Sequence, residues 1–359
     1  MDIANLRFAE YCARAGHPVH TVAHHADQSL LALPGVVFHR AARPLHADLL
    51  GMPFLRRAGL RVAAAVAKAG GRVVVNGGNC QWPDVNWVHY VHAAYRPSSA
   101  TGLARRAKAA IAHASFLQRE RQAITKARLV IANSNRTKKD LIEYLSVDPE
   151  RILTVYYGCD AAFAPPDAAE RAEARSKMGW MDDRPRVAFI GALGDRRKGF
   201  DTAFEAWRIL CRQSSWDADL IVIGRGAELP QWKQRAADAG LVNRIHFLGF
   251  RKDVPLILRA CDALVAPTRY EAYGLGVQEA LCCGLPAIVS ADAGVAERYP
   301  VDLNGLLLQD ANNSAELASR LNRWREDLSG MSTKVRSLSQ QLRLRSWDTM
   351  AGEILSAMQ

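Results

Sequence analysis

The sequence predicts an α/β protein made of two doubly wound domains, and three observations support this. Short β-branched runs recur along the whole chain, and each is followed by a stretch with helical spacing of apolar residues. Such alternation is typical of parallel sheets that are covered by helices on both faces. The length of 359 residues exceeds the usual size of one hydrophobic core. A polar, proline-bracketed stretch, APPDAAERAEARSKMGWMDDRP, separates two sets of runs.

The expected strands occupy both halves of the chain. In the first half they are the runs at 19–25, 36–40, 72–78, 86–93, 128–134 and 152–158. In the second half they are the runs at 186–192, 219–224, 244–250, 262–268 and 286–291. We expect an N-terminal domain over 1–165, a linker with a short helix over 166–184, a C-terminal domain over 185–335 and a further helical segment over 336–359. Ligands of such folds bind at the carboxyl ends of the strands, so we expect the two domains to face each other across a cleft.

The composition points to a globular protein of the cytoplasm. The longest apolar stretches, such as LRVAAAVAKAGGRVVV, are interrupted by Arg61, Lys68 and Arg72 before the ~20 residues that a membrane span needs. The opening MDIANLRFAEYC carries charges where a secretory signal would be apolar. Seven cysteines, an odd number without metal-ligand spacing, are typical of reduced core residues.

Basic residues are concentrated between Arg96 and Lys139. This segment contains eleven arginines and lysines and one acid, Glu120, in a chain with a net charge of +11. It includes LARRAKAAIAHASFLQRERQAITKARLV, which predicts one long helix or two short ones with a basic face. The face is either simply solvated or docks on an anionic membrane surface, where each basic residue contributes ~1 kcal/mol. Nucleic acid is disfavoured, because Phe116 is the only aromatic residue from 96 to 143 and stacking platforms are therefore absent.

The stretch RYEAYGLGVQEALCCGLPAIVS predicts a binding site. Gly274 and Gly276 come where a helix opens after a buried strand, so free backbone N–H groups can approach an anion there. Glu271 and Glu279 flank this bend, and carboxylates would repel a phosphate. We therefore expect them to accept hydrogen bonds from hydroxyl groups, one set on a sugar and the other on a ribose.

These residues carry a resemblance to a known family. EAYGLGVQE resembles the Glu-x7-Glu signature of the retaining glycosyltransferases of family 4, and VAFIGALGDRRKGFDTAFEAW is similar to the strand and Lys-Gly loop of that family. Weaker similarities cover most of the chain. They imply the two-domain glycosyltransferase-B fold, a nucleoside-diphosphate sugar as donor, a carbohydrate or lipid-linked acceptor, and a terminal helix over 336–359 that returns to the first domain.

The resemblance also implies roles for individual residues. Glu271 would hold the donor sugar and Glu279 the ribose, while Arg197 and Lys198 would neutralise the leaving diphosphate. The backbone amides that would face the sugar and the diphosphate are those of Tyr273, Gly274, Leu275 and Gly276. Many members have an arginine where this chain has Ala192, which removes one cation of the pattern.

His92, in NWVHYVHAAY, resembles the family's histidine that approaches the sugar from the acceptor domain. With Glu271 and Lys198 it completes the expected catalytic set. On a strand, His89 and His92 would point to opposite faces and could not share a metal. Nothing in the sequence requires a metal or another cofactor, because basic side chains and a helix terminus can serve the diphosphate.

The first element of the chain departs from the family pattern. Members begin with a strand and a glycine-rich loop, whereas here a helical stretch precedes the run at 19–25. The first, central strand is thus expected to be missing, either because the start lies downstream of the true one or because the product is truncated.

The leading interpretation is a retaining glycosyltransferase at the cytoplasmic face of a membrane, peripheral on its inner surface. Two alternatives remain. One is a catalytically inactive nucleotide-sugar-binding partner protein, which the N-terminal departure would favour. The other is a sugar-nucleotide epimerase on the same architecture, which would need no acceptor.

Overall fold

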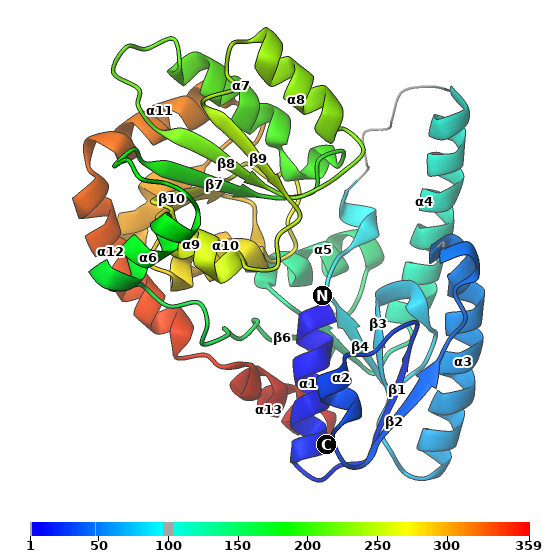
Figure 1. Cartoon of the computed structure of the whole chain (residues 1–359). Helices are drawn as coiled ribbons and strands as arrows, with labels where there is room; N and C mark the ends of the chain where they lie inside the picture. Colours follow the sequence, from blue (N-terminus) through cyan, green and yellow to red (C-terminus); the bar gives the residue numbers. More distant parts are fainter. Residues whose placement is uncertain (1, 47, 96–102) are drawn as a thin grey trace. The chain divides into compact units, whose positions relative to one another are not determined.

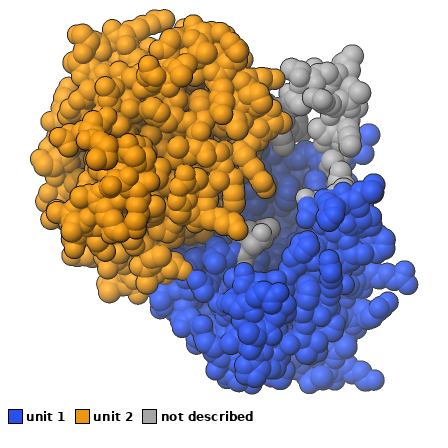
Figure 2. Space-filling view, in the orientation of Figure 1, with its two compact units in different colours: residues 1–158, 345–359 blue, residues 159–344 orange. Residues whose placement is uncertain are grey.

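The computed structural model describes residues 2–46, 48–95 and 103–359 and divides the chain into two compact units (Figures 1 and 2). Unit 1 comprises Met1–Gly158 and Arg345–Gln359, and unit 2 comprises Cys159–Leu344. The division comes earlier than the expected domain end at 165, and the expected linker lies wholly in unit 2. Of the helical segment expected over 336–359, the part before Arg345 also belongs to unit 2.

Packing explains these boundaries. The expected linker forms helix α6 (Ala168–Lys177), which contacts α9 (Val254–Ala260). Arg171 of α6 pairs with Asp262 at an Nη2–Oδ1 distance of 2.6 Å. The capping box between Asp167 and Glu170 starts the helix. Helix α12 (Leu328–Arg343) runs through position 336 and packs against α10 (Leu275–Cys282), which keeps it in unit 2.

Unit 2 is built on one parallel sheet with the strand order β12-β11-β10-β7-β8-β9. Its strands are β7 (Arg186–Ile190), β8 (Asp219–Ile223), β9 (Ile245–Gly249), β10 (Ala263–Ala266), β11 (Ala287–Ser290) and β12 (Leu307–Leu308). Its other elements are α7 (Phe200–Leu210), α8 (Leu229–Asp238), α11 (Ser314–Glu326), η5 (Arg196–Lys198), η6 (Gly294–Arg298) and η7 (Val301–Leu306). The first five strands coincide with expected runs. Strand β12 was not expected from the sequence, because a strand of two residues is too short to show a pattern.

Helices cover both faces of this sheet, as Figure 1 shows. Right-handed crossovers place α7 and α8 on one face and α9 and α10 on the other, because the chain reverses its direction across the sheet after β9. Between α7, α8 and the sheet lies an aromatic cluster in which Phe200 contacts Phe204 and Trp232. Trp207 and Trp216 pack edge to face nearby, and all five side chains are buried. Phe200 also packs edge to face on Phe189 of β7, with a ring-centroid distance of 5.1 Å.

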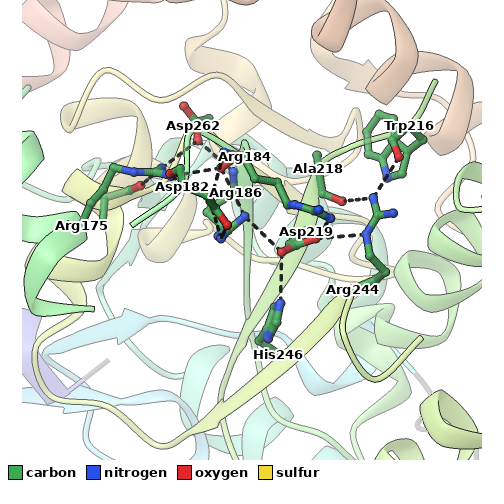
Figure 3. Close-up of polar contacts among 11 residues, drawn as sticks. Arg175, Asp182, Arg184, Arg186, Trp216, Ala218, Asp219, Arg244, His246 and Asp262 are labelled. Atoms are coloured by element: carbon green, nitrogen blue, oxygen red, sulfur yellow. Dashed lines mark hydrogen bonds and ion pairs between the residues drawn. The ribbon is translucent and has the colours of Figure 1, made fainter. Parts of the chain in front are cut away.

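A network of arginines and aspartates lies where β7 and β8 begin (Figure 3). Asp219, which is 3% exposed, accepts hydrogen bonds from Arg186 and Arg244 at 3.0 Å, His246 at 3.1 Å and Arg184 at 3.2 Å. Burial alone would raise the pKa of Asp219, but the hydrogen bond from His246 and the arginine charges hold it below its ordinary value. Since the strands are parallel, this edge is opposite the one at which ligands bind.

Unit 1 contains two parallel sheets, β1-β2 and β3-β4-β5-β6. Its strands are β1 (Val19–Ala23), β2 (Val36–Arg40), β3 (Val74–Asn76), β4 (Val85–Val88), β5 (Leu129–Ala132) and β6 (Ile152–Thr154). Its helices are α1 (Asp2–Arg14), α2 (Gln28–Leu31), α3 (Asp48–Lys68), α4 (Leu103–Ile124), α5 (Asn135–Leu145) and α13 (Trp347–Met358). Its short turns are η1 (Pro44–His46), η2 (Gly77–Asn79), η3 (His92–Ala94) and η4 (Pro149–Arg151).

All six expected strands of unit 1 are present, and among the described residues α1 precedes every strand. The strands form two sheets rather than one. Helix α13 packs against α1, and Arg14 pairs with Asp348 at an Nη2–Oδ1 distance of 2.6 Å. The hydroxyl of Ser346 caps α13 by accepting the N–H of Thr349.

The basic segment forms a single long helix, α4, followed by β5 and α5. Arg96 lies outside the described residues, and the side chains of Arg105, Arg106 and Lys108 are not among those described. Within the described ranges, no helix has both the length and the apolarity that a membrane crossing requires.

Candidate functional site

The predicted site residues of unit 2 lie at the carboxyl ends of two neighbouring strands, β7 and β10. The segment after β7 contains η5, and the segment after β10 leads into α10. Because parallel strands end at the same edge of a sheet, these two segments meet there. The sequence separates them by about seventy residues, so only the fold brings them together.

Gly199 allows the close contact between the two segments. Its φ angle of 71° is left-handed, and a Cβ atom there would lie 1.8 Å from the carbonyl oxygen of Pro267. Only glycine fits this approach without moving the backbone. The N–H of Arg269 donates to the carbonyl of Arg197 at 2.8 Å, which ties the segments together immediately beside the glycine.

Lys198 and Glu271 form an ion pair across this junction. The Nζ atom of Lys198 lies 2.6 Å from Oε2 of Glu271, and the side chains are 22% and 15% exposed. Partial burial lowers the local dielectric and strengthens the pair relative to an exposed one. Two residues that the sequence analysis assigned to the diphosphate and to the sugar are therefore in direct contact. A ligand that binds beside this pair can therefore contact both the Lys198 ammonium group and the Glu271 carboxylate.

Arg197 precedes Lys198 in the chain and is held by contacts to both segments. Its Nε atom pairs with Oδ2 of Asp195 at 3.1 Å, and its Nη1 atom donates to the carbonyl of Tyr270 at 3.4 Å. The Arg197 side chain is 19% exposed. Arg196 pairs with Asp201 at 2.9 Å and is more than half exposed.

The amino end of α10 is the third component of the site. Gly274, with φ 110°, is the N-cap, and a Cβ atom there would lie 3.0 Å from Cγ1 of Val295 and 3.3 Å from Cγ of Glu271. The first N–H groups of a helix have no partner inside it, and the helix dipole adds partial positive charge. Leu275 and Gly276 occupy these first positions and are half-buried. An anion at this helix end would lie close to the Lys198–Glu271 pair.

Tyr273 contributes to the site through its backbone only. Its ring is 1% exposed, its hydroxyl is hydrogen-bonded to Gln278, and its carbonyl accepts the N–H of Val295 at 2.7 Å. The side chain therefore packs under the bend rather than facing a ligand.

Glu279 lies on the second turn of α10 and has an unusual protonation equilibrium. Burial, with a further contribution from the Asp160 carboxylate, raises the pKa of Glu279 from 4.5 to about 7. The Asp160 side chain is itself held by the N–H of Ala162 at 3.0 Å. Groups with strongly perturbed pKa values cluster at functional sites, which agrees with the position of Glu279 beside the helix terminus.

One ion pair in this region, between Arg269 and Asp201, was not expected from the sequence. Arg269 makes two hydrogen bonds of 2.8 Å to the two carboxylate oxygens of Asp201, so it joins the segment after β10 to the first turn of α7. No pattern in the sequence identifies this pair, because the two residues are far apart in the chain and each alone is typical of an exposed charged residue.

His92 belongs to unit 1 and lies on η3 rather than on a strand. The strand expected over 86–93 is shorter than predicted, since β4 ends at Val88. The His92 ring is 38% exposed and its Nδ1 atom lies 2.9 Å from Oε1 of Glu120. His89, by contrast, is almost completely enclosed, is hydrogen-bonded to Tyr157, and burial lowers its pKa to about 3. Within the described residues, no group of three or more His, Cys, Asp or Glu side chains has the arrangement of a metal site.

Two family models match the chain side by side. The model for glycosyltransferase family 4 matches residues 4–163, and the model for glycosyl transferases group 1 matches residues 170–340. These ranges cover most of unit 1 and most of unit 2, respectively.

Individual relatives share part of their length with this chain. A D-inositol 3-phosphate glycosyltransferase from Salinispora tropica is 28% identical over 250 residues, which are 66% of this chain and 52% of the relative. A lipopolysaccharide core biosynthesis mannosyltransferase, LpsB from Rhizobium meliloti, is 38% identical over 175 residues, 46% of this chain and 45% of the relative. The chain thus spans about half the length of the curated relatives that it matches.

Solved structures show the same fold over nearly the whole chain. The crystal structure of WaaG, a glycosyltransferase of lipopolysaccharide biosynthesis, superposes with a TM-score of 0.75 at 19% identity and covers 98% of this chain and 95% of WaaG. HepE from Anabaena, in complex with UDP and glucose, gives a TM-score of 0.71 at 20% identity, with coverage of 99% and 95%. With both family models matched in sequence and the two-unit fold shared, the chain belongs to glycosyltransferase family 4 and has the glycosyltransferase-B fold.

Proposed function

We propose that this protein is a retaining glycosyltransferase that moves a sugar from a nucleoside-diphosphate sugar to a hydroxyl group of a polysaccharide, lipid-linked or other acceptor. The observation that carries the proposal is the cluster after β7 and β10, in which the Lys198–Glu271 pair lies beside the amino end of α10. A cation, an acceptor carboxylate and free helix N–H groups are the three components that an activated sugar needs.

Each residue has a role in the proposed reaction. Lys198 and Arg197 face the charge that develops on the departing diphosphate, with the backbone amides of Leu275 and Gly276 as further donors. Glu271 accepts hydrogen bonds from hydroxyl groups of the donor sugar. When a diphosphate binds, it competes with Glu271 for Lys198, so the ion pair of 2.6 Å holds both side chains near their working positions beforehand.

Glu279 is proposed to hold the ribose and His92 to approach the sugar from unit 1. No side chain is assigned as a covalent nucleophile, so retention is proposed to arise from a front-face displacement. The bond between the anomeric carbon and the phosphate oxygen breaks, the acceptor oxygen bonds to the same face of that carbon, and the leaving phosphate takes the proton of the acceptor hydroxyl. The proposal assigns neutralisation of the diphosphate to protein groups, and transfer should therefore persist in EDTA.

We place the reaction at the cytoplasmic face of a membrane. The basic residues on and around α4, such as Arg119 and Arg121 with their partly exposed side chains, support a peripheral contact with anionic lipid. Binding to vesicles that contain anionic lipid, and its loss in high salt, would test this assignment.

The donor can be identified by a thermal-shift panel of UDP, GDP, ADP and their sugars, because a bound ligand stabilises the folded state by RT ln(1 + [L]/Kd). Incubation of the selected donor with and without acceptor separates transfer from hydrolysis and from epimerisation. The anomeric configuration of the first product, read by NMR, tests retention.

Glu271→Gln provides the decisive variant. In Glu271→Gln the rise in Tm caused by the sugar nucleotide should be smaller than in the wild-type protein. The rise in Tm caused by the free nucleotide should stay largely the same. Glu326→Gln, on an exposed position of α11, is the matched control. Equal loss for the sugar nucleotide and the nucleotide would contradict the role of Glu271.

A further inference from the structure

Glu120 is a buried acid in a strongly basic part of the chain. It lies on α4 and its side chain is 1% exposed. A buried carboxylate is unfavourable unless donors satisfy it. Three N–H groups do so here. Oε1 accepts the backbone N–H of His92 at 2.8 Å and the ring Nδ1 of His92 at 2.9 Å, and Oε2 accepts the backbone N–H of Ala93 at 3.2 Å.

The fold provides the space for this contact through Gly78. A Cβ atom on Gly78, in η2, would lie 2.9 Å from the backbone nitrogen of Glu120 and 3.2 Å from its Cα atom. A side chain at position 78 would therefore push α4 away from η2. The glycine lets the helix lie close enough for Glu120 to reach the start of η3.

Aromatic contacts fix the plane of the His92 ring. Phe116, one turn before Glu120 on α4, stacks on the ring with a centroid distance of 5.3 Å and an interplanar angle of 13°. Tyr90 meets it edge to face at 4.8 Å. With one ring nitrogen held by Glu120 and one face covered by Phe116, rotation of the ring is restricted.

The hydrogen bond also determines which ring nitrogen carries the proton. Oε1 already accepts the backbone N–H of His92 and Oε2 that of Ala93, so the carboxyl group acts as the acceptor and Nδ1 as the donor in this contact. In neutral His92, Nε2 then has the free lone pair. No residue in the described part of the chain is hydrogen-bonded to Nε2, and the ring is 38% exposed.

From this geometry we infer that Glu120 is a positioning residue, which holds His92 in the Nδ1–H tautomer so that Nε2 accepts a hydrogen bond from a hydroxyl group of the bound sugar. The inference rests on the proposed role of His92. It specifies that Nε2 of His92 accepts a hydrogen bond from the sugar hydroxyl and does not donate one.

The first test needs no substrate. The two imidazole nitrogens are observed by two-bond ¹H–¹⁵N correlation in protein with ¹⁵N-labelled histidine, and His92→Ala assigns the signal. The ligand-free wild-type protein should show the Nδ1–H tautomer. Glu120→Leu has no acceptor opposite Nδ1, so the wild-type Nδ1–H signal should be lost in favour of the Nε2–H form. Glu120→Asp keeps a carboxylate and should retain the wild-type pattern.

The second test measures transfer with the nucleotide sugar that the thermal-shift panel selects. Glu120→Leu should lower kcat by at least about 10-fold, as loss of a partner that orients a functional histidine does elsewhere. Glu120→Asp should recover part of the loss, and Glu143→Gln, an exposed position on α5, should change nothing. Circular dichroism and Tm confirm that each variant is folded.

The two tests distinguish failure of the inference about Glu120 from failure of the proposed role of His92. An unchanged Nδ1–H signal in Glu120→Leu, or an Nε2–H signal in the wild-type protein, refutes the positioning role whatever the activity. Wild-type transfer by His92→Ala instead refutes the role of His92 in the proposed function, while the tautomer result stands.

Discussion

Glu279 should make the stability of this protein depend on pH near neutrality. Its pKa is about 7 in the folded chain and close to the ordinary 4.5 when unfolded. Between these values the folded state binds a proton that the unfolded chain has released, so the free energy of unfolding falls as pH rises. The contribution is most favourable below pH 4.5 and is lost as pH rises through 7.

The size of the effect follows from the two pKa values. Their difference corresponds to about 3 kcal/mol in total, of which about 2.5 kcal/mol is lost between pH 5 and pH 8. For a unit of this length, 1 kcal/mol moves Tm by about 2–4 °C. Glu279→Gln cannot titrate, so the amount by which its Tm exceeds that of the wild-type protein should grow by roughly 5–10 °C from pH 5 to pH 8.

Calorimetry on the full chain at both pH values measures this difference directly. Glu326→Gln, at an exposed position, serves as the control for the loss of one carboxylate. A ¹³C titration of the Glu279 carboxyl group gives the pKa independently. An equal Tm difference at pH 5 and pH 8, together with a carboxyl that titrates near 4.5, would refute the assigned environment.

Three further predictions concern the same unit. Gly199→Ala should destabilise the fold by at least about 2 kcal/mol in urea denaturation, since the added Cβ would lie 1.8 Å from the Pro267 carbonyl; wild-type stability would contradict the described contact. Asp219→Ala should cost about 3 kcal/mol in urea denaturation, because it removes the buried carboxylate that Arg186 and Arg244 share and leaves Arg186 with Asp182 as its remaining acid. Since the pKa of Asp219 is lowered, its contribution is present at neutral pH and should be lost as pH falls from 3.8 through the lowered folded-state pKa. Lys198→Met should weaken binding of UDP or GDP by about 10-fold or more in calorimetric titration, and unchanged affinity would remove Lys198 from the diphosphate site.

Local patterns in the sequence were sufficient for much of the fold. Eleven strands lie where β-branched runs predicted them, because a buried parallel strand needs a continuous apolar run that is visible within five or six residues. The bend at Gly274 and the opening of α10 were predictable for the same reason, since helix starts and glycine turns depend on near neighbours.

Tertiary structure corrected several expectations. The polar stretch over 166–184 has the composition of a linker, but α6 packs into unit 2 through Arg171 and Asp262, a contact that no local pattern contains. The strand that carries Trp87 ends at Val88, so His92 is on η3 and is oriented by a residue of another helix.

The sequence by itself determined the fold class, the family resemblance and the identity of the residues around the glycine bend. Only the tertiary structure decided that Lys198 touches Glu271, that burial and Asp160 shift the titration of Glu279, and that Glu120 reaches His92. The physical reason is the separation along the chain of the residues that interact. Strand and helix patterns arise from neighbours along the chain, whereas ion pairs and pKa shifts depend on distances between segments that sheet order and crossover connections alone bring together.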